Sequence, residues 1–172
     1  PAAAATLQRW HQMIASNDLQ ALPELLHEQA VFRSPMAHTP YPGAPVVGLI
    51  LKTVVQVFEG FTYHRELVSE DGLNVVLEFS ARVGDKQLKG IDMIRFDEQG
   101  KIVEFEVMVR PMSGLQALGE EMAKNPRIFV MGEGVGERGG NFATTSGLYA
   151  IHGAERLRDT PICERGFVGL AC

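Results

Sequence analysis

The sequence predicts an α+β fold in which a curved antiparallel sheet wraps around three N-terminal helices and a Gly-rich extension follows. Apolar residues recur at helical spacing before Phe61. From Phe61 to Val109 they alternate with a period of two, which is typical of strands. After Asn125 both patterns stop, and nine of the 18 glycines lie there. Three short helices cannot cover both faces of such a sheet, so a sheet curved around them, with a cavity between, is the economical arrangement.

The first helix is predicted by three apolar residues on one face, Leu7, Trp10 and Ile14. Asp18 is a suitable N-cap for a second helix, which places its leucines inward and tolerates Pro23 in its first turns. The third helix carries its apolar face at Leu51, Val54, Val55 and Phe58.

Between the second and third helices we expect a short strand over Ala30 to Ser34 and then a loop. The loop runs from His38 to Gly48, because three prolines and two glycines interrupt regular structure there.

The following segment predicts an antiparallel meander. A first strand covers Thr62 to Ser69, and Gly84-Asp85 makes a tight hairpin turn between two later strands. Alternation places one face of each strand inward: Val75, Leu77, Phe79, Ala81 and Val83; Leu88, Asp92, Ile94 and Phe96; Val103, Phe105, Val107 and Val109. A short helix from Ser113 to Lys124 follows.

Composition excludes several classes of function. A net charge of −5 argues against a general nucleic-acid-binding surface, and no apolar stretch approaches the length of a membrane span. The start of the chain lacks the pattern of a signal peptide, and the two cysteines fit no metal-ligand spacing. We therefore expect a cytoplasmic protein with no nucleic-acid or membrane partner and no metal.

Asp92 is the strongest candidate for chemistry. Its carboxyl shares a predicted strand face with apolar side chains, and burial should raise its pKa. A neutral acid can then donate a hydrogen bond to a developing oxyanion. The alternative is that Asp92 pairs with Arg95, Lys89 or a backbone amide at the rim of the sheet.

The order of elements, with Gly90 to Phe96 followed by Gly100 to Val103, resembles the nuclear-transport-factor-2-like superfamily, which includes ketosteroid isomerases and SnoaL-like cyclases. The resemblance covers about residues 6–122. It implies a cone-shaped α+β barrel with a deep apolar pocket for a small apolar ligand, and commonly a homodimer. Because this fold hosts many activities, the resemblance implies the fold more firmly than the reaction.

Three positions of the ketosteroid isomerases can be compared with this sequence. Asp92 matches their protonated aspartate. Trp10 stands where they have a tyrosine that contacts the oxyanion, and its indole N–H can still donate a hydrogen bond. Ser34 stands where they have the general-base aspartate, and an unassisted serine is a poor base at neutral pH.

The loop offers two substitutes for the missing groups. His38 has the residue type of a base near neutral pH, and Tyr41 could orient a polar ligand atom. The alternative, which is the more common case for polar loop residues, is a solvated histidine and a tyrosine that anchors the loop by packing. Phe58 and Met108 complete the candidates for ligand contact, although methionines in such patterns also fill protein cores.

The segment after Asn125 resembles the start of the beta subunit of thiamine-dependent 2-oxoacid dehydrogenases. The matching residues are 125–133, 145–147 and 158–170. The resemblance implies that Glu164 contacts the aminopyrimidine ring of thiamine diphosphate. Gly134 replaces a usual acidic residue, and the diphosphate-binding region has no counterpart in the sequence, so we expect no bound cofactor and interpret residues 125–172 as a fused or truncated segment.

These observations predict two domains, a pocket domain over residues 1–124 and an extension over residues 125–172. The leading hypothesis is a small-molecule-binding protein that acts as an isomerase, cyclase or hydrolase on an apolar, carbonyl-bearing ligand. A second hypothesis is a non-catalytic binding or dimerisation module, which Ser34 favours. A third is a fragment of a thiamine-dependent enzyme.

Overall fold

A computed structural model describes residues 2–124, 130–132, 149–150 and 157–159 of the chain. The chain divides into two compact units, Pro1–Leu118 and Gly119–Cys172. Each unit contains a sheet of its own, six-stranded in the first and two-stranded in the second.

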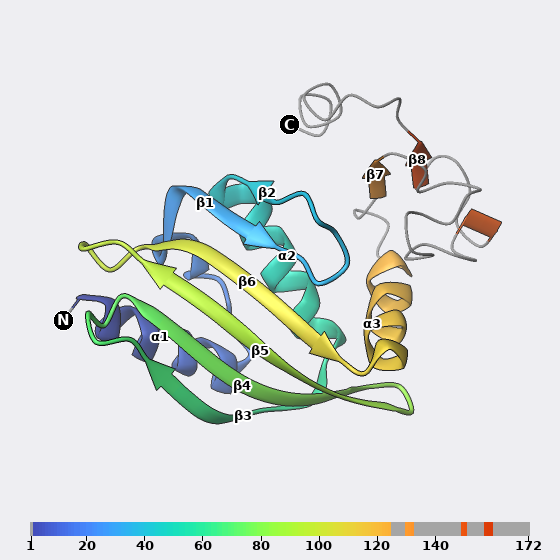
Figure 1. The fold of residues 1–172 in the computed structure, drawn as a ribbon, viewed down its shortest axis with the longest axis horizontal. Coiled ribbons are helices and arrows are strands. Elements are labelled where there is room, and N and C mark those ends of the chain that lie inside the picture. Colours follow the sequence, from blue (N-terminus) through green and yellow to red (C-terminus); the bar gives the residue numbers. More distant parts are fainter. Residues whose placement is uncertain (1, 125–129, 133–148, 151–156, 160–172) are drawn as a thin grey trace. The chain divides into compact units, whose positions relative to one another are not determined.

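The first unit is built on a six-stranded curved sheet with the strand order β2-β1-β6-β5-β4-β3 (Figure 1). Because β2 and β3 are the two ends of this order, the sheet does not close into a full barrel. The strands are β1 (Leu26–Arg33), β2 (Tyr41–Pro42), β3 (Glu59–Val68), β4 (Asn74–Val83), β5 (Lys86–Phe96) and β6 (Ile102–Arg110).

The α+β class and the predicted meander are confirmed. Strands β3 to β6 pair antiparallel in sequence order. The sheet as a whole is mixed, however, since β1 pairs parallel with β6. Gly84 and Asp85 form the predicted two-residue hairpin between Val83 and Lys86, and Gly84 has a φ of 57°, which glycine adopts without a steric penalty.

Two α-helices, α1 (Ala2–Ser16) and α2 (Ala44–Val57), lie against the same face of the sheet (Figure 1). The first helix ends where Asn17 takes a positive φ of 53°. Helix α2 begins inside the predicted loop, directly after Gly43, which has a φ of 99°. Pro45 lies in the first turn of α2, where a backbone N–H would have no helical partner in any case.

The predicted second helix is wrong. Its residues form only a single 3-10 turn, η1 (Leu22–Glu24), and β1 starts at Leu26 rather than at Ala30. Leu26 pairs with Ile102 of β6, so tertiary strand pairing overrides the local helical spacing of the leucines.

The core of the first unit lies between the helices and the inner face of the sheet. Alternation predicted this face correctly in β4 and β5, whose inward side chains are all buried. The largest side chains that are almost completely buried include Trp10, Phe79 and Phe105. Thr53 and Asp92 are the buried polar side chains among the described residues.

The helix α3 (Met112–Lys124) crosses the boundary between the units. In the second unit, β7 (Val130–Gly132) pairs parallel with β8 (Leu157–Asp159). Within the described ranges, no helix is both long enough and apolar enough to cross a membrane.

Candidate functional site

The candidate site centres on Asp92, in the middle of β5. Its neighbours across the sheet are Leu77 of β4 and Val107 of β6, and its side chain points to the helix-covered face. The residue is only 5% exposed. The predicted placement of this carboxyl among apolar side chains is therefore confirmed, and pairing at the rim of the sheet is excluded.

A directed chain of hydrogen bonds reaches Asp92 from α1. The indole N–H of Trp10 donates to the hydroxyl oxygen of Tyr63 over 2.9 Å. The Tyr63 hydroxyl donates in turn to Oδ2 of Asp92 over 2.6 Å. Within the described part of the chain, Oδ1 of Asp92 has no hydrogen-bond partner.

The electrostatics follow from burial. Loss of solvent raises the pKa of Asp92 from 3.8 to about 7, and the hydrogen bond from Tyr63 opposes this rise only in part. Burial also raises the pKa of Tyr63 well above 10, and the nearby Asp92 adds to this effect. Tyr63 therefore keeps its proton, and Asp92 exchanges its proton near neutral pH.

Aromatic rings pack on one side of Tyr63. Phe61 meets the Tyr63 ring edge-on at 4.8 Å and stacks on Phe79 at 5.0 Å, and Phe58 lies 5.7 Å from Phe79. The Phe79 ring occupies the space over Gly90, where an added Cβ would come within 2.3 Å of it. A side chain at Gly90 would therefore displace the ring that supports Tyr63.

Three of the predicted site residues are not joined to this chain of hydrogen bonds. Ser34 follows β1, and its hydroxyl accepts a hydrogen bond from the backbone N–H of Met36 over 3.1 Å. His38 is exposed in the bend that follows at residues 38–39. Tyr41 lies in β2 and is 36% exposed, while burial of its hydroxyl raises its pKa. No hydrogen bond or ring contact among the described residues links these three to Asp92.

The remaining predicted residues divide by position. Trp10 is buried, but its N–H serves Tyr63, so it is not free to reach a ligand. Phe58 belongs to the aromatic group beside Tyr63. Met108 is 48% exposed and pairs with Ile91, so it lies on the sheet face opposite to Asp92. Glu164 lies outside the described residues.

Tyr63 is the member of this hydrogen-bond chain that sequence reasoning missed. Phe61 and Tyr63 alternate in β3, so periodicity alone places the hydroxyl on the inner face. The missing information was that Tyr63, which pairs with Phe79, reaches diagonally across β4 to Asp92. A tyrosine on the inward face of a neighbouring strand therefore indicates a candidate hydrogen-bond partner for a buried carboxyl.

The described residues contain no group of three or more His, Cys, Asp or Glu side chains that could hold a metal ion. A buried carboxyl with a raised pKa, such as that of Asp92, is able to donate a hydrogen bond and to exchange a proton.

Comparison with known proteins separates the chain into two parts. A family model for the SnoaL-like domain matches residues 7–105. The crystal structure of a steroid delta-isomerase from Pseudomonas aeruginosa is 72% identical, with a TM-score of 0.71 over 72% of this chain and 90% of that one. A bacterial protein with a cystatin-like fold from Silicibacter pomeroyi is 31% identical, with a TM-score of 0.65 over 70% of this chain and 86% of that one.

The second part matches a different group. The model of the transketolase pyrimidine binding domain matches residues 107–172. The pyruvate dehydrogenase E1 component subunit beta of Mesostigma viride is 47% identical over 55 residues, 32% of this chain and 17% of that protein. The 2-oxoisovalerate dehydrogenase subunit beta of Bacillus subtilis is 48% identical over 54 residues, 31% of this chain and 16% of that protein. The chain thus spans less than a fifth of the length of these relatives.

Proposed function

The chain belongs to the SnoaL-like domain family, and we propose that it binds a small apolar ligand whose carbonyl oxygen accepts a hydrogen bond from the neutral carboxyl of Asp92. One observation carries the proposal. The buried carboxyl has Oδ2 engaged by Tyr63, and Oδ1 has no partner within the described residues. An unpartnered polar atom in an apolar site is costly, and a ligand oxygen would relieve that cost.

The hydrogen-bond chain gives the carboxyl a direction. Because the Tyr63 hydroxyl donates to Oδ2, the acid proton of Asp92 belongs on Oδ1. Because Trp10 donates to the Tyr63 oxygen, the tyrosine proton is directed to Asp92 and away from a ligand. When negative charge develops on a bound carbonyl oxygen, the Oδ1 proton stabilises it in a water-poor site, where such donors are most effective.

The class of ligand follows from the relatives. The 72% identical steroid delta-isomerase supports a steroid or a similarly flat, apolar ketone as the ligand. The aromatic group of Phe58, Phe61 and Phe79 beside Tyr63 suits such a ligand. Isomerisation is the first candidate reaction. A cyclase or hydrolase would use the same donor with a different proton acceptor.

The test is turnover of an unsaturated ketosteroid, followed by the ultraviolet absorbance that changes when the double bond joins the carbonyl. Asp92→Leu removes the donor and should lower kcat by roughly 100- to 1,000-fold. Asp92→Asn keeps a weaker donor and should lose less. Glu78→Gln, on the opposite sheet face, is the matched control and should retain full activity. Full activity in Asp92→Leu would remove Asp92 from the reaction.

The second candidate function is a ligand-binding module without catalysis. Ser34 supports it, because this residue stands at the general-base position of the related isomerases, where an unassisted hydroxyl is a poor base. Its oxygen also accepts a hydrogen bond from the Met36 amide. In that case the protein binds the steroid ketone in an Asp92-dependent manner, and no isomerised product forms.

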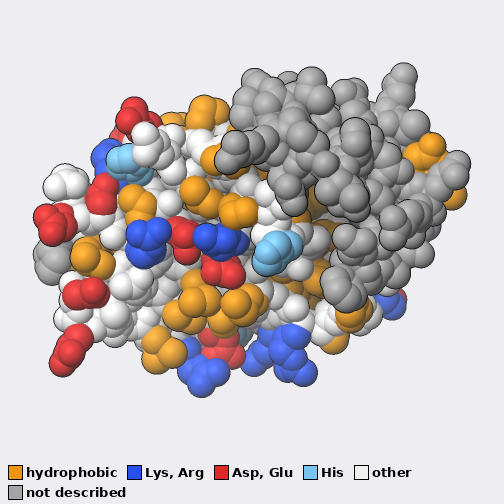
Figure 2. Space-filling view, turned by 45° about the horizontal axis from the view of Figure 1, so that its top comes forward, with side chains coloured by type: hydrophobic (Ala, Val, Ile, Leu, Met, Phe, Trp, Pro, Cys, Tyr) orange, Lys and Arg blue, Asp and Glu red, His pale blue; other side chains and the backbone are white. Residues whose placement is uncertain are grey.

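We further propose a homodimer through the outer face of the sheet. Apolar side chains gather there on β4, β5 and β6, among charged ones: Val76, Ile91, Met93 and Met108 (Figure 2). Met93 is 37% exposed and Met108 is 48% exposed. Light scattering should report a dimer for the wild type and a smaller mass for Met108→Glu. An unchanged mass would place the interface elsewhere.

For the second unit we propose that residues 125–172 form the start of a fused pyrimidine-binding domain. The parallel pairing of β7 with β8 favours this interpretation, since parallel strands joined by a long connection are typical of α/β domains. Calorimetric titration with thiamine diphosphate tests it. Saturable binding that is lost in Glu164→Gln would show a working cofactor site, and no binding would leave this segment without one.

A further inference from the structure

Strand β3 carries an irregularity beside the candidate site. Tyr63 pairs with Phe79, but Glu66 pairs with Leu77, so three steps along β3 match two steps along β4. Without this bulge, Glu66 would face away from Tyr63, because strand side chains alternate. With the bulge, Glu66 lies opposite the inward-facing Leu77 and shares the side of the sheet that faces α1.

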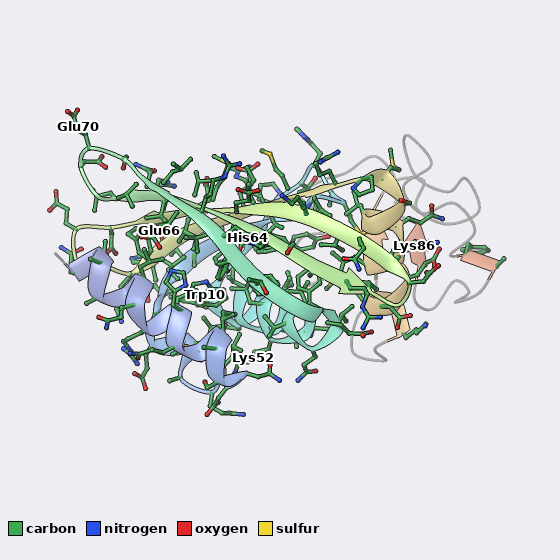
Figure 3. The ribbon with its side chains drawn as sticks, turned by 90° about the horizontal axis from the view of Figure 1, so that it is seen from below. Trp10, Lys52, His64, Glu66, Glu70 and Lys86 are labelled. Atoms are coloured by element: carbon green, nitrogen blue, oxygen red, sulfur yellow. The ribbon has the colours of Figure 1, made fainter. Side chains whose placement is uncertain are left out.

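On α1, two consecutive residues contact Tyr63. Trp10 donates to its hydroxyl, and the His11 ring meets its ring edge-on at 5.3 Å with an interplanar angle of 89°. Nε2 of His11 also lies 3.0 Å from Oε2 of Glu66. Figure 3 shows α1 beneath the sheet, with Trp10 between them and Glu66 on the strand above the helix. Tyr63 is thus held at the hydroxyl by Trp10 and along the ring by His11.

We propose that His11 and Glu66 are a positioning pair that fixes the Tyr63 ring and so holds its hydroxyl on Asp92. The inference rests on the proposed role of Asp92 and adds two residues to it that do not touch the ligand. The bulge brings Glu66 to the interface between α1 and β3. There Glu66 holds the His11 ring, and the His11 ring packs against Tyr63.

The pair has a measurable consequence at Asp92. The hydrogen bond from Tyr63 lowers the pKa of Asp92 against the larger effect of burial. A Tyr63 ring that is free to shift would make this bond less often, and the pKa of Asp92 would rise further. The pKa of Asp92 therefore reports on the position of Tyr63, and it can be measured without a ligand or turnover.

The experiment is a carbon-13 NMR titration of the Asp92 carboxyl in the ligand-free protein, with the resonance assigned by its loss in Asp92→Asn. His11→Ala should move the pKa of Asp92 from about 7 toward roughly 8. His11→Phe keeps a ring against Tyr63 but loses the contact with Glu66, and Glu66→Gln keeps a hydrogen-bonding group without the charge. Both should move the pKa in the same direction by less.

Arg9→Gln is the matched control. It breaks the pair of Arg9 with Glu24, which also ties α1 to a neighbouring element through exposed side chains, at 2.6 Å. We expect no change at Asp92. The proposal is overturned if His11→Ala leaves the Asp92 titration unchanged, or if Arg9→Gln moves it equally. If His11→Ala does not fold, unchanged titrations in both His11→Phe and Glu66→Gln overturn it.

The two proposals can fail separately. Full turnover by Asp92→Leu would remove the catalytic role of Asp92 and leave the titration result standing. An unchanged titration in the His11 and Glu66 variants would remove the positioning pair and leave the Asp92 donor intact.

Discussion

Asp92 and Glu78 are two carboxyls on adjacent strands and opposite faces of one sheet. Asp92 pairs with Leu77, and Glu78 pairs with Ile91, so the two side chains are one residue row apart. Burial raises the pKa of Asp92 to about 7. Hydrogen bonds from Arg65 and then Lys89 lower the pKa of Glu78. One row of register thus decides whether burial raises the pKa of a carboxyl or exposed cations lower it.

The largest expected effect concerns stability against pH. The folded pKa of Asp92 is raised above its ordinary value of 3.8, so folded protein keeps a proton that unfolded protein loses between about pH 4 and pH 7. The free energy of unfolding should therefore fall as pH rises through that window and level off above it. The loss due to Asp92 is roughly 4 kcal/mol.

Denaturant unfolding of the wild type and of Asp92→Asn at pH 5 and pH 8 measures this loss. Asn remains neutral, so the variant should gain stability relative to the wild type as pH rises. A difference between the two proteins that does not depend on pH would show that Asp92 titrates normally.

The next largest effect is expected where Gly90 packs against Phe79 on the inner face of the sheet. In Gly90→Ala the new Cβ would approach the Phe79 ring to 2.3 Å and the Met108 carbonyl oxygen to 2.5 Å. The backbone oxygen cannot rotate away, so we expect destabilisation by roughly 2–3 kcal/mol. Lys89→Ala, one residue earlier on the outer face, is the control for thermal unfolding. Equal melting temperatures for wild type and Gly90→Ala would mean that the strand shifts freely.

Tyr63→Phe removes the hydroxyl at the centre of the hydrogen-bond chain from Trp10 to Asp92. The change leaves the Trp10 N–H and Asp92 Oδ2 without their partner and should cost roughly 1–3 kcal/mol. It should also raise the pKa of Asp92, since the hydrogen bond that lowers it is gone. Chemical denaturation and the carboxyl titration measure the two effects. A lower pKa of Asp92 in this variant would contradict the assignment of Tyr63 as donor.

The smallest effect is expected on the outer face. Glu78→Gln removes an anion whose pKa is lowered by solvent-exposed partners, so it should change stability little at pH 7. What stability Glu78 contributes is present above its ordinary pKa and is lost as pH falls, the reverse of Asp92. Unfolding at pH 4 and pH 8 checks the sign. A gain in the stability of Glu78→Gln over the wild type as pH rises would mean that Glu78 behaves like Asp92.

The sequence predicted the inner-face position of Asp92 because the alternation in β4 and β5 is uninterrupted. It did not predict the partner of Asp92, because Tyr63 lies two strands away and reaches Asp92 diagonally. It also did not predict the contact between His11 and Glu66, because a bulge in β3 shifts the alternation and periodicity does not reveal where a bulge falls. The leucines around Pro23 failed as a helix because pairing with β6 decided their structure.

The turn at Gly84 and Asp85 sets which carboxyl is enclosed. The length of this turn fixes the pairing of Val83 with Lys86, and the register of the same two strands then pairs Leu77 with Asp92. One residue inserted there that shifted the β5 register would bring Ile91 to the interior and turn Asp92 to water. The length of a surface turn thus controls the pKa of a distant side chain. An insertion in that turn would expose Asp92 to solvent, although every residue of the site would remain in the sequence.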